Sequence, residues 1–308
     1  MVSSDDGMIV VGTKTGRLLV SHRTGNTEPQ DAVWQELDRE QYSPNYPIYS
    51  LAMGNDVVFA GAGDKYVSIW TQRGSRLHFQ GRLGPHTGWV KDVTYCQTSK
   101  LLYSIGCNCV ESWDVADTSA TRHVSKRSIE NSPDTGYTLS SDLLSLCLVP
   151  SQCLLSGGVD GRIHVWSLDP LDLEPVHSSR IHDGRVNAMV YSSEMNVLFS
   201  VGHDGRIVAS RLRTDPRGLE AKTNHRVGEA SSRWTRLCLV TECANGCRLV
   251  VGTTEGNVIC IDVGADLDIK EYSTLSIVGA PMIYSLSTLS DQSTILVGHA
   301  HGLVAIQR

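Results

Sequence analysis

Cysteine and histidine are the residue types in this sequence whose spacing first suggests chemistry. Thiolates and imidazoles bind zinc, and such sites usually pair their ligands at characteristic short spacings. Cys107 and Cys109 have one residue between them, and Cys243 and Cys247 have three. These spacings fit a zinc site poorly, and the two pairs fall in different repeats of the sequence. We therefore expect no metal site.

Motifs for catalysis are missing from the sequence. It contains no Gly-x-Ser-x-Gly turn for acyl transfer, no glycine-rich phosphate loop and no His-Glu-x-x-His segment for metal-dependent hydrolysis. His299 and His301 fall in a predicted hairpin turn, where ordinary turn residues are the simpler explanation. We expect no enzyme, no cofactor and no small-molecule substrate.

The composition indicates a globular protein. The 308 residues are 41% hydrophobic and 19% charged, which excludes disorder of the whole chain. No apolar run reaches the roughly 18 residues of a membrane helix, and the first residues lack the pattern of a secretory signal. Nine scattered cysteines suit a reducing compartment, so we expect a cytoplasmic or nuclear protein. A net charge of -6 argues against a protein whose whole surface binds nucleic acid.

An internal repeat positions these residues. Residues 154–166 contain two short apolar strands around a glycine–aspartate turn, which is typical of a β-hairpin. A further apolar strand precedes six of the hairpins, and weaker fourth strands fall in the connections. Four short strands in about 40–45 residues predict one propeller blade. The residues equivalent to Gly161 stand at positions 16, 65, 108, 161, 205, 256 and 302.

The repeated unit resembles the WD-repeat family over nearly the whole chain. Residues 84–90 and 181–186 resemble the Gly-His segment that opens the family's repeat, and Trp113-Asp114 is a literal Trp-Asp pair. The resemblance implies one all-β domain over residues 1–308, folded as a seven-bladed propeller of four-stranded antiparallel blades. It also implies a non-catalytic scaffold or adaptor that binds other proteins or peptide segments.

The family's structural residues are only partly present. A histidine, a strand hydroxyl, a turn aspartate and a tryptophan form a hydrogen-bonded set in such blades, because buried imidazole and indole groups need partners. No blade of this chain matches all four positions: Cys107 replaces the aspartate in the blade of His86, and Ser210 replaces the tryptophan in the blade of His182. The residues that match are Asp64, Trp70, His86, Trp113, Ser156, Asp160, Trp166, His182, Ser200 and Asp204.

The repeat is incomplete at both ends of the sequence. It begins near a second strand, at Ile9, and stops at Arg308, at the end of a third strand. In this family the N-terminal strand usually completes the last blade. We therefore expect an incomplete seam between blades one and seven, and we favour a native polypeptide that extends further upstream over a ring that closes with a thinner seam.

Two regions are candidate binding sites. The first is the propeller rim, where the residues that begin the inner strands border the family's central channel and belong to types enriched at binding hot spots; its members are Trp89, Arg185, Arg233 and Met282. The second is a basic patch between residues 211 and 236, comprising Arg211, Arg213, Arg217, Lys222, Arg226 and Arg236. Ordinary blade packing and a solvated loop are the simpler explanations of the two regions. Protein partners are favoured; nucleic acid bound by the basic patch in a ribonucleoprotein or chromatin complex is the alternative.

Overall fold

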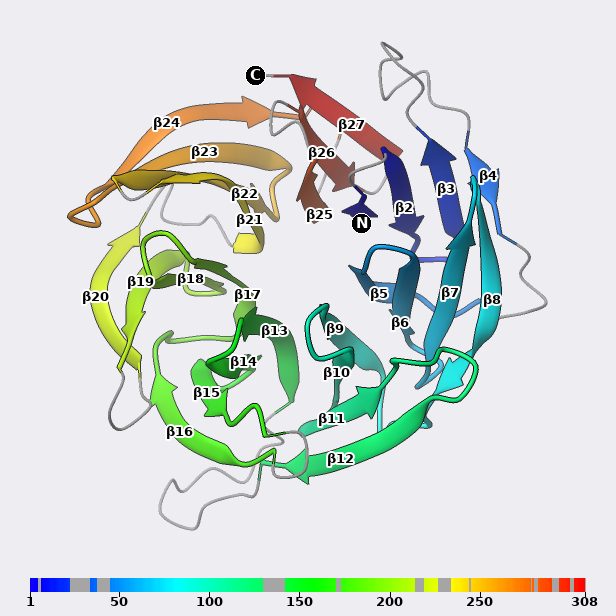
Figure 1. The fold of residues 1–308 in the computed structure, drawn as a ribbon. Coiled ribbons are helices and arrows are strands. Elements are labelled where there is room, and N and C mark those ends of the chain that lie inside the picture. Colours follow the sequence, from blue (N-terminus) through cyan, green and yellow to red (C-terminus); the bar gives the residue numbers. More distant parts are fainter. Residues whose placement is uncertain are drawn as a thin grey trace. The chain divides into compact units, whose positions relative to one another are not determined.

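The chain folds into short antiparallel strands (Figure 1). The described residues form 27 strands and no helix. This part of the chain therefore contains no helix long and apolar enough to cross a membrane. The computed structural model describes residues 1–4, 7–22, 34–37, 45–129, 142–169, 173–213, 219–226, 234–243, 245–277, 279, 282–289, 294–299 and 302–307.

The strands form sheets in which the order in space follows the order in the chain. The first sheet consists of β1 (Val2–Ser3), β2 (Met8–Gly12), β3 (Leu18–His22) and β4 (Gln35–Glu36). The second consists of β5 (Ile48–Met53), β6 (Val57–Ala62), β7 (Val67–Arg73) and β8 (Arg76–Leu83). The third consists of β9 (Val90–Cys96), β10 (Leu101–Gly106), β11 (Cys109–Asp114) and β12 (Arg122–Ser128).

The remaining sheets repeat this pattern. The fourth contains β13 (Leu143–Val149), β14 (Cys153–Gly158), β15 (Arg162–Trp166) and β16 (Pro175–Arg180). The fifth contains β17 (Val186–Ser192), β18 (Val197–Gly202), β19 (Arg206–Leu212) and β20 (Leu219–Arg226). The sixth contains β21 (Trp234–Cys243), β22 (Gly246–Thr253), β23 (Asn257–Gly264) and β24 (Ile269–Ser276), and the seventh β25 (Ile283–Thr288), β26 (Thr294–His299) and β27 (Gly302–Gln307).

Seven sheets of this connectivity give a seven-bladed all-β propeller, which confirms the predicted fold class. The two blades expected to be incomplete are also the thinnest. In the first, β1 has 2 residues and pairs with β2 through Val2 and Val10. In the seventh, the described residues supply three strands.

The chain divides into two compact units. Met1–Leu154 with Trp166–Pro175 forms the first, and Leu155–Val165 with Val176–Arg308 forms the second. That residues 1–308 act as a single domain stays a prediction.

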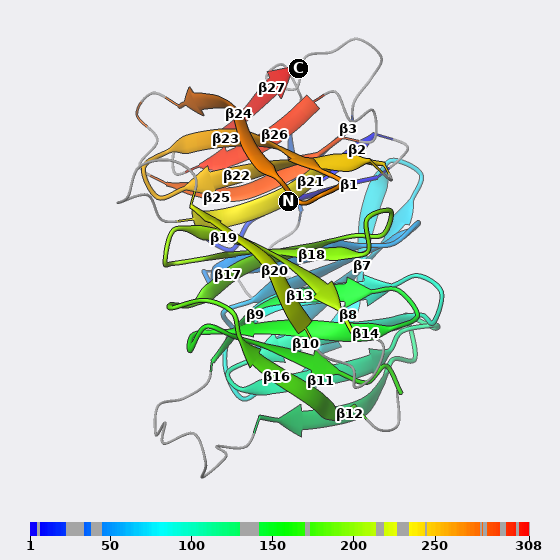
Figure 2. The same ribbon diagram turned by 90° about the vertical axis from the view of Figure 1, so that its left-hand side faces the viewer.

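Apolar clusters join consecutive sheets within each unit. In the first unit, Val58 and Trp70 of the second sheet pack with Val10 of the first. In the second unit, Phe199 and Leu249 belong to one cluster between the sheets β17–β20 and β21–β24, which lie face to face in Figure 2. Because each fully buried aliphatic or aromatic side chain contributes about 1.5–3 kcal/mol, these clusters hold the blades against one another.

The hairpin turns follow the repeat predicted from the sequence, with one exception. Gly161 and Gly205, at two of the predicted turn positions, have φ angles of 80° and 72°, a conformation that glycine adopts without strain. In the third sheet the left-handed residue is Cys107, with a φ of 56°, and Gly106 pairs with Cys109 across a two-residue turn. In the fifth sheet three residues separate the strand ends Gly202 and Arg206, so the turn of the third sheet is one residue shorter, and the position of the aspartate is lost with it.

Candidate functional site

Three of the four predicted rim residues are described, and each immediately precedes the first strand of its sheet. Trp89 immediately precedes β9 in the first unit and is 53% exposed. In the second unit, Arg185 precedes β17 and is exposed, whereas Met282 precedes β25 and is half-buried. Arg233 lies outside the described residues.

Trp89 belongs to a cluster of two aromatic rings and one cation. The rings of Tyr49 and Trp89 stack with their centroids 5.9 Å apart and their planes 22° from parallel. The Nζ atom of Lys91 lies 4.0 Å from the centroid of the Tyr49 ring and 4.5 Å from that of Trp89. We call these three residues the aromatic–lysine patch.

The aromatic–lysine patch comes from two neighbouring inner strands, β5 and β9. Because side chains alternate along a strand, Trp89 and Lys91 lie on one side of the chain, while Asp92 between Lys91 and Val93 lies on the other. The sequence analysis did not single out Tyr49 and Lys91. Their signal was the repeat itself, since the spacing from Pro47 to Tyr49 equals that from Trp89 to Lys91.

Asp92 fixes the strand that carries Lys91. Its Oδ1 atom accepts hydrogen bonds from the Ser50 hydroxyl at 2.5 Å and from the backbone N–H of Val93 at 3.0 Å. Its Oδ2 atom accepts one from the backbone N–H of Leu146 at 2.7 Å. One carboxylate therefore links the inner strands β5, β9 and β13, and this network holds the aromatic–lysine patch in place.

The loop before Trp89 rests on the short turn of the third sheet. A Cβ atom at residue 88 would lie only 2.2 Å from the Cys107 sulfur, so any other residue at Gly88 would force the Cys107 side chain to move. The carbonyl of Cys107 also accepts a hydrogen bond of 2.8 Å from the N–H of Leu143. The turn without an aspartate thus supports the exposed tryptophan.

Partial burial changes the acid–base behaviour of the patch. Burial lowers the pKa of Lys91 from its ordinary value, while Asp142 and Cys107 nearby act in the opposite direction. Burial also raises the pKa of Tyr49. The patch therefore combines an un-ionised phenol, a partly desolvated ammonium group and an exposed indole, which suits binding.

Blade three keeps most of the expected hydrogen-bonded set. The Trp113 indole N–H donates to the Ser104 hydroxyl at 2.9 Å, and Nε2 of His86 lies 2.7 Å from the same oxygen. Nδ1 of His86 lies 3.1 Å from the carbonyl oxygen of Lys65. Because a carbonyl can only accept, His86 donates from Nδ1, and the Lys65 carbonyl takes the place of the missing aspartate.

Blade five keeps the other half of the set. Nδ1 of His182 lies 3.0 Å from Oδ1 of Asp204, and its Nε2 lies 2.9 Å from the Ser200 hydroxyl. Asp204 also accepts hydrogen bonds from the backbone N–H groups of Asp183 and Arg206. Burial raises the pKa of Asp204, but these hydrogen bonds and the histidine outweigh it and lower the pKa. Ser210, at the tryptophan position, is fully buried, and among the described residues its hydroxyl has no hydrogen-bond partner.

The remaining motif residues have structural positions. In blade two the Trp70 indole N–H donates to Ser68 at 3.0 Å, and Asp64 forms an ion pair with Arg82. In blade four, Asp160 accepts a 3.0 Å hydrogen bond from the N–H of Arg162. Two further residues of blade four, Ser156 and Trp166, are fully buried.

The predicted basic patch is described only in part. Arg217 lies outside the described residues, as do the side chains of Lys222 and Arg226. Of the others, Arg211 is exposed, Arg213 lies 3.7 Å from Glu220, and Arg236 donates to the Tyr284 carbonyl at 2.7 Å. Two of these three arginines thus have partners within the protein.

Neither cysteine pair forms part of a metal cluster in the described part of the chain, where no three histidine, cysteine or acidic side chains gather. The Cys109 sulfur lies 3.1 Å from the Ser128 hydroxyl, and Cys247 is buried. The side chain of Cys243 and all of His301 lie outside the described residues.

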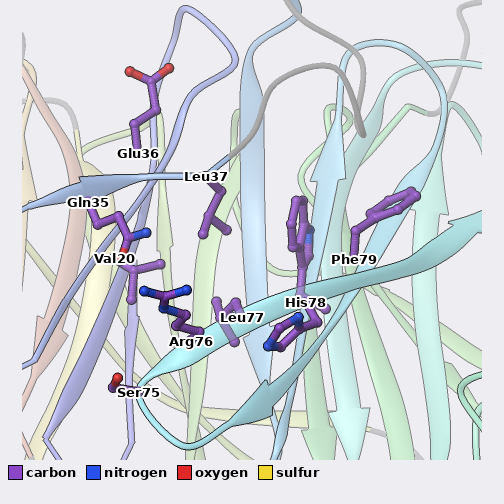
Figure 3. Close-up of a pocket in the computed structure, with 10 residues that line it drawn as sticks. Val20, Gln35, Glu36, Leu37, Ser75, Arg76, Leu77, His78 and Phe79 are labelled. Atoms are coloured by element: carbon purple, nitrogen blue, oxygen red, sulfur yellow. The ribbon is translucent and has the colours of Figure 1, made fainter.

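A pocket of about 360 Å³ opens between β4 and β8 (Figure 3). None of the residues that line it belongs to the aromatic–lysine patch. Leu37, Leu77 and Trp70 in its wall belong to the apolar cluster between the first two sheets. Its polar side chains do not converge, since Glu36 points away from Arg76 in Figure 3. The pocket therefore continues the core of the first two blades.

A family model described as WD domain, G-beta repeat, matches residues 124–167. These residues hold most of β12 and all of β13, β14 and β15. The matched segment is thus similar to a WD repeat, and it forms part of a seven-bladed β-propeller. WD-repeat propellers generally act as protein-interaction scaffolds and are typically not enzymes.

The chain is also similar to a crystal structure of a protein from Lactobacillus plantarum. The TM-score is 0.78 at 13% sequence identity, and the match covers 98% of this chain and 92% of that chain. At this identity the likeness concerns the fold alone. No curated protein sequence matches the chain.

Proposed function

We propose that this WD-repeat propeller is a non-catalytic scaffold that binds segments of other proteins at the ends of its inner strands. In the first unit the aromatic–lysine patch carries the binding. In the second unit Arg185 and Met282 contribute at the equivalent positions of their own blades, and Arg233 is expected to do the same.

The observation that carries this proposal is the exposure of Trp89. A tryptophan that is 53% exposed leaves a large apolar surface in water, and tryptophan is the residue type most enriched at binding hot spots. The ring is already stacked on Tyr49 and its strand is tied down by Asp92, so little conformational entropy is lost when a partner covers it.

Affinity purification followed by mass spectrometry tests the proposal. Wild-type protein and the variant Trp89→Ala are compared with a matched control, Val176→Ser, which alters an exposed apolar side chain (44% exposed) on the outer strand β16. We expect Trp89→Ala to lose partners that both other proteins retain. Identical partner sets for all three proteins would reject the aromatic–lysine patch as the binding site.

A further inference from the structure

Within the described part of the chain, the ammonium group of Lys91 has aromatic neighbours but no acceptor for its hydrogens. Its Nζ atom lies over the rings of Tyr49 and Trp89, and among the described residues it makes no hydrogen bond or ion pair. The faces of the two rings attract the positive charge, yet they replace none of the three hydrogen bonds that an ammonium group makes in water.

Two nearby carboxylates, those of Asp92 and Asp142, do not accept hydrogen bonds from this ammonium group. Both oxygens of Asp92 are already bonded to Ser50, Val93 and Leu146. Asp142 is close enough to act on Lys91 electrostatically, but it forms no ion pair with it. Lys91 is thus a half-buried cation, held in one orientation, whose hydrogen-bond donors are open to a partner.

We propose that the aromatic–lysine patch recognises an acidic peptide segment, in which an aspartate or glutamate carboxylate binds Lys91 and a neighbouring apolar or aromatic side chain covers Trp89. This rests on the proposed function and adds the chemistry of the partner. A carboxylate fits a single ammonium group, whereas phosphate groups favour several donors or the planar fork of arginine. A nucleic acid is disfavoured because its backbone is bound through several cationic contacts, whereas the patch offers a single ammonium group with the Asp142 carboxylate nearby.

A phage-displayed library of random short peptides, selected on the full-length protein, tests the proposal. Phage that bind wild-type protein better than Trp89→Ala are kept, and their peptides are synthesised with each acidic residue or with its amide counterpart. We expect a shared acidic residue beside an apolar one. Replacement of that residue by its amide is expected to weaken binding about tenfold or more.

Variants of the protein then identify the partner of the carboxylate. Lys91→Met is expected to weaken binding of the acidic peptide about as much as the amide replacement does. It is expected to leave binding of the amide peptide unchanged, because the two changes remove the same carboxylate–ammonium interaction. Asp142→Asn is expected to strengthen the acidic peptide about twofold by removing a like charge. Lys14→Met, an exposed lysine in the turn of the first sheet, is the matched control and is expected to change nothing.

The outcomes separate this inference from the proposed function. If no peptide distinguishes wild-type protein from Trp89→Ala, the binding site itself is wrong. If peptides are selected but their amide forms bind as tightly as their acidic forms, the proposed recognition of a carboxylate is wrong. It is also wrong if the effects of the amide replacement and of Lys91→Met add, because two changes to one interaction should not be additive. Single-stranded DNA that binds wild-type protein but not Lys91→Met would also overturn it. The peptide replacement is measured on wild-type protein, so the test holds even if Lys91→Met does not fold.

Discussion

Blades three and five each bury a histidine, and each supplies its hydrogen-bond partners with a different part of the WD-repeat set. Both bury a histidine between a strand hydroxyl and an acceptor on its other side. In blade three the acceptor is the Lys65 carbonyl, and a tryptophan completes the set. In blade five the acceptor is the Asp204 carboxylate, and the tryptophan is replaced by Ser210. A backbone carbonyl can thus replace the carboxylate of the WD-repeat motif as the acceptor, but the two arrangements should be destabilised under different conditions.

Asp204→Ala should give the largest effect. It removes the acceptor of the buried His182 imidazole and of the backbone N–H groups of Asp183 and Arg206, which should cost about 3 kcal/mol of stability. The aligned change in blade three, Cys107→Ala, removes no hydrogen bond of the set and should cost less than about 1 kcal/mol. Calorimetry of both variants measures the difference; equal losses would contradict the stabilising role assigned to the Asp204 carboxylate.

Acid should destabilise the two blades in different pH ranges. Burial lowers the pKa of His86 from 6.5, so the unfolded state takes up a proton more readily and stability falls as the pH drops below 6.5. The pKa of Asp204 is lowered from 3.8, so its contribution is present above pH 3.8 and is lost as the pH falls through the lower folded value.

Thermal unfolding measured against pH checks these ranges. In His86→Gln the unfolding temperature should fall less steeply as the pH drops below 6.5. In Asp204→Asn only the fall of the unfolding temperature below pH 3.8 should become less steep. Burial lowers the pKa of His164 to about 4, so His164 adds to the upper range, and the double variant His86→Gln/His164→Gln should be flatter still. An unchanged upper decline in the double variant would contradict the assignment.

Trp113→Phe should have a smaller effect, confined to blade three. Phenylalanine keeps most of the buried ring but cannot donate to Ser104, so we expect a loss of about 1 kcal/mol. Trp70→Phe in blade two, which loses the equivalent bond to Ser68, is the matched comparison. A much larger loss for Trp113→Phe would show that the indole also supports His86, 5.6 Å away between ring centroids.

Ser210→Ala should give the smallest effect, with the opposite sign. Its buried hydroxyl has no partner, so removing it should stabilise the protein by less than about 1 kcal/mol. The same substitution at Ser200 removes the partner of His182 and should destabilise it by about 1 kcal/mol. Urea unfolding of both variants is the measurement, and a destabilising Ser210→Ala would indicate that the hydroxyl binds an ordered water.

The fold could be predicted from the sequence because the apolar strands and their turns recur in register. Gly161 and Gly205 occupy the turn positions that the repeat assigned to them. The site could be predicted only at Trp89. Tyr49 and Lys91 become meaningful when two strands lie side by side, which a single strand's pattern does not reveal. The Lys65 carbonyl had no signal at all, because every residue has one.

The family repeat at residues 124–167 is out of phase with the blades: it begins in the last strand of one sheet and ends in the third strand of the next. Anyone who wishes to delete, duplicate or transplant a repeat therefore has two choices of cutting point. A cut between sheets keeps the four strands of each blade together, with the hydrogen bonds between them. A cut at the sequence repeat keeps the outer strand of one blade joined to the next blade, and the sheet that loses this strand has an unpaired outer edge. Since bare edges promote aggregation, the choice of cutting point governs whether such an engineered protein remains dispersed.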